Sequence, residues 1–181
     1  MSERVAAIER LAGLVRSIPD FPRKGILFRD VTTLLADPRG LRDAVSLMVE
    51  EWRGAGITRV VAIEARGFLF GAPIAIELGA GIVPARKPGK LPWRVSRETY
   101  TLEYGTDALE MHEDAVGPGE RVLLVDDLLA TGGTAAASIS LIQRLGGEVV
   151  GAAFLIELVD LGGRARLAPV PVSALINFAG E

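Results

Sequence analysis

The chain has 181 residues, 49% of them hydrophobic, which is enough for one domain with a substantial core. Its formal net charge of -3, with no dense run of lysine or arginine, argues against non-specific nucleic-acid binding. The lack of cysteine excludes disulfides and thiolate metal sites and is consistent with a cytoplasmic location. Charges near the N-terminus interrupt the apolar core that a secretory signal needs, so we expect no export.

The chain opens with a helix and then a loop that carries much apolar surface. Residues 2–18 show the apolar spacing of a helix, and Pro19 is expected to end it. Residues 20–30 are punctuated by proline and glycine, yet they carry large apolar side chains at positions 21, 26, 27 and 28. This surface predicts either a flap of the core or a hood over a flat apolar ligand, with Arg29 beside it.

An amphipathic helix over residues 41–52 precedes a strand, loop and helix unit. Residues 59–65 indicate a buried strand and residues 68–78 a helix. We expect no membrane span here, because Glu64 and Arg66 would each cost about 2.5 to 3.5 kcal/mol at mid-membrane. Arg66, at the start of the helix, suits either an ion pair at the helix end or a grip on phosphate oxygens.

A basic loop and a ribbon come next. After a short strand at residues 82–84, Arg86, Lys87 and Lys90 predict either a polyphosphate-binding loop or a solvated basic loop. Residues 95–111 alternate enough to predict a two-stranded ribbon bent at residues 105–106, which is either a lid over a site or an ordinary hairpin. His112, the single histidine, has no nucleophile motif nearby, so we expect a surface residue.

The most informative stretch is residues 121–134, RVLLVDDLLATGGT. A buried strand delivers two carboxylates, Asp126 and Asp127, to the edge of a sheet, and a glycine loop then opens a helix. Backbone amides at such a helix start favour a phosphate, while ionised carboxylates accept hydrogen bonds from sugar hydroxyls. Neither GxxxxGK[ST] nor GxGxxG occurs here, and the alternative is a tight turn with solvated or capping acids.

The C-terminal part supplies further elements of the same kind. Residues 148–157 predict the last long strand, residues 158–167 a loop and short helix, and residues 171–178 an edge strand or tail. With the earlier units, the chain is long enough for a five-stranded sheet with helices.

VDDLLATGGT resembles the phosphoribosyl-diphosphate (PRPP) loop of the type I phosphoribosyltransferase family, and DDLLATGGT is similar to its adenine-using members. Further blocks that resemble that family cover almost the whole chain: FP..G..FRD, EARGFLFGAPIA, RKPGKLP, LEYGTDALEMH and IELVDLGGRARL. The resemblance implies an α/β fold, with a mainly parallel twisted sheet flanked by helices, in a single domain over residues 1–181. It also implies a small hood over about residues 1–35 and a flexible hairpin lid over about residues 95–111.

The resemblance assigns site residues position by position. It implies PRPP and AMP binding by Asp126, Asp127, Ala130, Thr131, Gly132, Gly133 and Thr134. It implies pyrophosphate binding by Arg66 and Lys87, and adenine binding by Leu27, Phe28, Arg29 and Leu158. Glu103 would act as the acid or base at the purine N7, with Tyr104 packed over the site.

The implied reaction converts adenine and PRPP to AMP and pyrophosphate, a purine-salvage step. Mg²⁺ would be held mainly through PRPP, since it prefers phosphate oxygens, hydroxyls and water to a dedicated protein cage. The family also implies a homodimer, in which Trp93 or the Arg86 loop could reach across. The alternatives are a phosphoribosyltransferase for another purine base, a PRPP-sensing regulator of the same fold, and a non-catalytic scaffold.

Overall fold

Five parallel strands form the central sheet of the computed structural model, which describes residues 3–102 and 105–180. Their order is β4-β3-β7-β8-β9, and every neighbouring pair is parallel, so the prediction of a mainly parallel α/β fold is confirmed. The strands are β3 (Arg59–Ile63), β4 (Gly81–Ala85), β7 (Arg121–Leu129), β8 (Glu148–Leu158) and β9 (Val172–Phe178). The expected edge strand near the C-terminus is β9.

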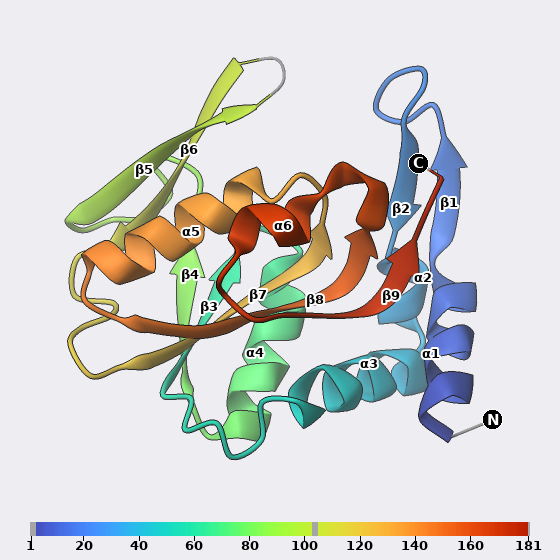
Figure 1. The fold of residues 1–181 in the computed structure, drawn as a ribbon, viewed down its shortest axis with the longest axis horizontal. Coiled ribbons are helices and arrows are strands. Elements are labelled where there is room, and N and C mark those ends of the chain that lie inside the picture. Colours follow the sequence, from blue (N-terminus) through green and yellow to red (C-terminus); the bar gives the residue numbers. More distant parts are fainter. Residues whose placement is uncertain (1–2, 103–104, 181) are drawn as a thin grey trace.

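Helices cover both faces of this sheet (Figure 1). On one face lie α1 (Glu3–Leu14), α2 (Thr32–Ala36), α3 (Pro38–Glu50) and α4 (Gly67–Leu78). On the other lie α5 (Gly133–Arg144) and, beside it, α6 (Gly163–Leu167), which the short η1 (Val159–Leu161) precedes in the chain. Parallel strands need this cover because both faces of each strand are apolar.

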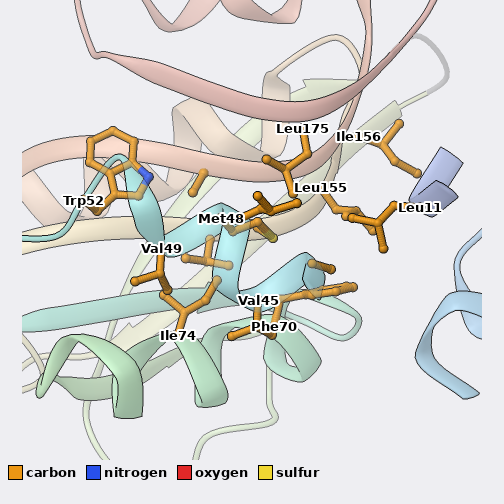
Figure 2. Close-up of a cluster of buried hydrophobic side chains, with 14 of the residues drawn as sticks. Leu11, Val45, Met48, Val49, Trp52, Phe70, Ile74, Leu155, Ile156 and Leu175 are labelled. Carbon is orange, nitrogen blue, oxygen red and sulfur yellow. The ribbon is translucent and has the colours of Figure 1, made fainter. Parts of the chain in front are cut away.

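Side chains along a strand point alternately to the two faces of the sheet, so each strand contributes residues to the core on both faces. In β7, Leu123 and Val125 pack with the α3 and α4 side, whereas Val122 and Leu124 pack with the α5 side. Figure 2 shows the first of these clusters, in which side chains from α3, α4, β8 and β9 meet. Strand β7 is therefore buried on both sides up to the two acids.

Trp52 fills the end of that cluster. Its indole is only 6% exposed and its Nε1 donates to Ser173 Oγ at 3.1 Å. The ring lies against Gly151, where a Cβ would come within 2.1 Å of Trp52 Cη2. Glycine is thus required in β8 so that the indole ring can approach the strand closely.

Two small antiparallel ribbons extend from opposite sides of the domain (Figure 1). One pairs β1 (Arg16–Pro19) with β2 (Leu27–Asp30), and the other pairs β5 (Val95–Leu102) with β6 (Gly105–His112). The first ribbon corrects the prediction of one helix over residues 2–18 and a loop over residues 20–30. The helix ends at Leu14 because the next residues pair with β2.

The second ribbon matches the predicted two-stranded segment, but the predicted bend at residues 105–106 is wrong. Gly105 pairs with Leu102 and Thr106 with Thr101, so both belong to the ladder. Within residues 3–102 and 105–180, the helices are too short or too polar to cross a bilayer.

Candidate functional site

The glycine loop leads directly from β7 into α5. Gly132 adopts φ 77° and ψ 4°, the left-handed region that glycine enters without steric cost. A Cβ there would also lie 2.9 Å from the carbonyl oxygen of Gly163, so the loop packs tightly against the start of α6. The first amides of α5 have no partner within the helix and carry its positive dipole end.

A cavity of about 90 Å³ lies at this helix start. It is lined by Asp126, residues 128–135 and Phe154. All five loop residues predicted to bind the phosphoribosyl group, Ala130, Thr131, Gly132, Gly133 and Thr134, therefore face one small space. A tetrahedral anion suits a site of this size, dipole and donor density.

The two acids have different surroundings. Asp126 is half-buried and lines the cavity, whereas Asp127 is only 3% exposed and its Oδ2 lies 2.8 Å from Arg66 Nε. Asp127 thus faces Arg66 in this structure, and its predicted part in binding the sugar stays a prediction. Successive side chains of a strand point to opposite faces, and β7 continues through both acids to Leu129.

Burial raises the pKa of both carboxyls above 3.8. The charge of Asp127 raises the pKa of Asp126 further, while the guanidinium of Arg66 opposes both shifts. The pair therefore resists carrying two negative charges. Sugar hydroxyls or a cation in the cavity would stabilise the ionised form of Asp126.

Arg66 joins the acid pair to the N-terminal ribbon. It precedes α4, and its guanidinium lies 5.2 Å from the ring of Phe28 in β2 as well as beside Asp127. Its position thus combines the predicted helix-end ion pair with a contact to the hood. Gly67 follows, and a Cβ there would lie 2.9 Å from Asp126 Oδ1, so the two strand-to-helix loops meet at the sheet edge.

The predicted basic loop is held by Glu64 at the end of β3. Its carboxylate accepts from the backbone amide of Lys87 at 2.8 Å and from Arg86 Nε at 3.2 Å. Burial works to raise the pKa of Glu64, but these hydrogen bonds hold it below 4.5. Glu64 is thereby ionised at neutral pH and fixes the start of the loop.

The Lys87 side chain reaches the hairpin and, through it, α5. Its Nζ forms an ion pair with Asp107 of β6 and lies 3.1 Å from the hydroxyl of Tyr100 in β5. Thr134 Oγ1 donates to the same hydroxyl at 3.3 Å. The structure therefore connects Lys87, a predicted pyrophosphate ligand, to Thr134, a predicted phosphate ligand, through one tyrosine.

The adenine residues predicted in the hood lie on β2, beside the sheet edge. Phe28 is half-buried and meets Phe21 edge to face, with ring centroids 5.0 Å apart. The guanidinium of Arg29 lies 3.8 Å from the ring of Phe178, and its Nη1 donates to Ser17 Oγ at 2.6 Å. Phe178 is in register with Leu158 at the end of β8, so the hood and the predicted base pocket tail meet at β9. Leu27, also half-buried, begins β2.

Several residues that organise the site were not predicted. Tyr100 and Asp107 face each other across the ribbon ladder, a pairing that follows once the hairpin register is known. Glu157 is 4% exposed and holds Arg164, whose neighbour Gly163 packs on the glycine loop. The sequence signal that could have pointed to Glu157 is its position as an acidic residue at the end of a predicted strand.

Two predictions concern residues at the edge of the site. Glu103 and Tyr104, expected in the lid, lie outside the described residues. The expectation that His112 is a surface residue is wrong for its Nε2, which is buried without a hydrogen-bond partner among the described residues. Its ring meets Trp93 edge to face at 6.3 Å. Trp93 itself is 53% exposed.

Comparison with known proteins identifies the family. Residues 30–169 match the family described as the phosphoribosyl transferase domain. An adenine phosphoribosyltransferase from Escherichia coli O1:K1 is 56% identical over 183 residues, covering 100% of both chains. The chain belongs to the adenine phosphoribosyltransferase family.

Solved structures of other adenine phosphoribosyltransferases share the fold. One from Rhodothermus marinus superposes with a TM-score of 0.93 at 52% identity, covering 96% of this chain and 99% of that one. Another, from Saccharomyces cerevisiae, has a TM-score of 0.89 at 38% identity, covering 94% of this chain and 99% of that one. The yeast structure is a complex with D-2,5-dideoxy-2,5-imino-altritol 1,6-bisphosphate and adenine.

Proposed function

We propose that this protein transfers the phosphoribosyl group of PRPP to adenine and releases AMP and pyrophosphate in purine salvage. The observation that carries this proposal is the cavity at the start of α5, which combines the glycine loop with the carboxylate of Asp126. Full-length identity of 56% to an adenine phosphoribosyltransferase supports the choice of reaction.

In the proposed reaction, the loop amides bind the 5′-phosphate and Asp126 accepts hydrogen bonds from the ribose hydroxyls. Holding the sugar in this way leaves its C1 between the departing pyrophosphate and the incoming N9 of adenine. Such positioning can contribute about 7 to 11 kcal/mol to lowering the barrier. The negative charge of Asp126 also stabilises the positive charge that develops on the sugar.

Pyrophosphate departs as a polyanion, and Lys87 is the leading group to receive it. Arg66 contributes positive charge while it holds Asp127. Phe28 and Leu158 would enclose the adenine ring, with the backbone around Leu27 at its edge and Arg29 fixing the hood to Phe178. Glu103 is proposed as the acid or base at N7, on the lid formed by about residues 95–111.

Mg²⁺ is proposed as the cofactor, arriving with PRPP. Among residues 3–102 and 105–180, no group of three or more metal-ligating side chains could hold it alone. The half-buried carboxylate of Asp126 fits one position in a coordination shell otherwise made of hydroxyls, phosphate oxygens and water. When bound, the ion would neutralise charge on the pyrophosphate.

We also propose a homodimer in the cytoplasm, built from a single catalytic domain of residues 1–181 with its hood at about residues 1–35. An exposed apolar surface on α4 and β4 supports self-association. It includes Leu69, Ile82 and Ile76, which is 80% exposed, and it adjoins a groove of about 520 Å³ lined by Leu41, Val45 and Pro73. A monomer rarely leaves such a surface uncovered.

The deciding experiment measures AMP formation from PRPP with adenine, hypoxanthine, guanine and xanthine in competition. We expect adenine to be used and the other bases to compete poorly. Preferential turnover of another base would replace adenine as the proposed substrate. The absence of turnover at saturating PRPP and adenine would favour a PRPP-sensing regulator.

A further inference from the structure

We propose that Asp107 is an internal competitor for pyrophosphate: it holds the Lys87 ammonium until a pyrophosphate group takes its place. This inference rests on the proposed role of Lys87 as a pyrophosphate ligand. In this proposal, the Asp107 carboxylate lowers the affinity of the protein both for the pyrophosphate end of PRPP and for the pyrophosphate product.

The geometry places three polar groups within reach of one another. Lys87 Nζ is paired with Asp107 and lies 3.1 Å from the Tyr100 hydroxyl, which in turn lies 3.2 Å from Asp107 Oδ2. Tyr100 is 7% exposed and directly opposes Asp107 in the β5–β6 ladder. An ammonium has three donors, so two of them are already engaged.

The pair can open because it is not sealed in the core. The side chains of Lys87 and Asp107 are 39% and 28% exposed, and the net contribution of such an ion pair is small. An incoming polyanion would offer Lys87 several charged oxygens and would at the same time be repelled by the Asp107 carboxylate. The attraction to Lys87 favours binding, whereas the repulsion by Asp107 and its competition for the ammonium oppose binding while Asp107 is charged.

Electrostatics support the charged state of both partners. Burial acts against it, but the hydrogen bonds from Lys87 and the Ala108 amide hold the pKa of Asp107 below 3.8. Burial also acts to lower the pKa of Lys87, but its contacts with Asp107 and Tyr100 outweigh burial, so the pKa of Lys87 lies above 10.5. Asp107 is therefore an anion throughout the working pH range.

The tyrosine keeps Lys87 near the phosphate site when the carboxylate is released. Tyr100 contacts both Lys87 Nζ and Thr134 Oγ1, which begins the α5 side of the cavity. Exchange of Asp107 for pyrophosphate therefore requires no large movement of the lysine. After the reaction, Asp107 can take Lys87 back, which favours release of pyrophosphate.

Asp107→Asn tests the charge while keeping the size and a hydrogen-bond acceptor. We expect calorimetric titration to show pyrophosphate binding tightened about two- to fivefold, the range that matches loss of an exposed ion-pair interaction. The KM for PRPP should fall in the same proportion. Ribose 5-phosphate, which lacks the pyrophosphate group, should bind as it does to the wild type.

Glu148→Gln is the matched control variant. It also removes one negative charge from an ion pair, with Arg121 at 2.6 Å, but at the opposite end of the parallel strands. Its pyrophosphate affinity should equal that of the wild type. If both variants tighten binding equally, net charge explains the effect and the inference is overturned.

Lys87→Met and the Lys87→Met/Asp107→Asn double variant separate this inference from the proposed function. Weaker pyrophosphate binding in Lys87→Met supports the role of Lys87, and unchanged binding removes that role. If Asp107 acts mainly by competing for Lys87, adding Asp107→Asn to Lys87→Met should tighten pyrophosphate binding much less than adding it to the wild type, and equal tightening in both backgrounds would overturn the competition. Should Lys87→Met bind weakly while Asp107→Asn binds no better than the wild type, Asp107 is not a competitor; Asp107→Ser provides a second test of the same charge.

Discussion

The glycine loop gives the sharpest test of the phosphate site, through Gly132→Ala. Gly132 has φ 77°, a conformation that costs an alanine about 1 to 2 kcal/mol. The new Cβ would also lie 2.9 Å from the Gly163 oxygen and 3.2 Å from its Cα, so the loop or the start of α6 must shift. A shift that removes one amide hydrogen bond to a charged phosphate weakens binding about ten- to 100-fold.

Gly79→Ala is the control for backbone strain. Gly79 ends α4 at φ 66°, and a Cβ there would meet nothing within 4 Å. Urea unfolding should show a loss of about 1 to 2 kcal/mol for Gly79→Ala and a larger loss for Gly132→Ala. Calorimetric titration with ribose 5-phosphate should show weaker binding for Gly132→Ala alone. Wild-type affinity in Gly132→Ala would refute the assignment of this loop to the phosphate.

Three further predictions concern charge, metal and assembly. Burial raises the pKa of the Asp126 carboxyl above 3.8, so the wild type should lose stability relative to Asp126→Asn as the pH rises above about 4. The variant should make AMP more slowly than the wild type, and a stability difference in urea unfolding that does not change with pH would contradict this reasoning. Chelation with EDTA should abolish AMP formation until Mg²⁺ is restored, without changing the thermal midpoint, and undiminished turnover would rule out the proposed metal. Ile76→Lys should convert dimers to monomers in sedimentation velocity, and a monomeric wild type would disprove the proposed homodimer.

The regular elements could be predicted because their signals are local. Apolar runs of strand length, followed by glycine and a helical pattern, located β3, β7 and their helices closely. The hood ribbon was missed because β1 and β2 are each four residues long and gain their structure by pairing with one another. Local propensity does not reveal such a pairing.

The sequence predicted which residues form the site better than it predicted the contacts between them. Asp126 and the glycines and hydroxyl residues of the loop do gather around one cavity. That Asp127 turns away to Arg66 follows from the strand period, once β7 is known to continue past both acids. The contact between Lys87 and Asp107 depends on the register of a ribbon, and sequence spacing alone leaves that register open.

The fluorescence of the two tryptophans reports on two different regions of the molecule. Trp52 is sealed between Gly151 and Ser173 and reports on the packed domain, whereas Trp93 lies open to solvent beside His112 at the base of the ribbon. Iodide should therefore quench the emission of Trp93 and spare that of Trp52. Replacing Trp93 with phenylalanine would leave a natural fluorophore for global unfolding, and the difference between the two spectra would follow the ribbon during turnover without an attached dye.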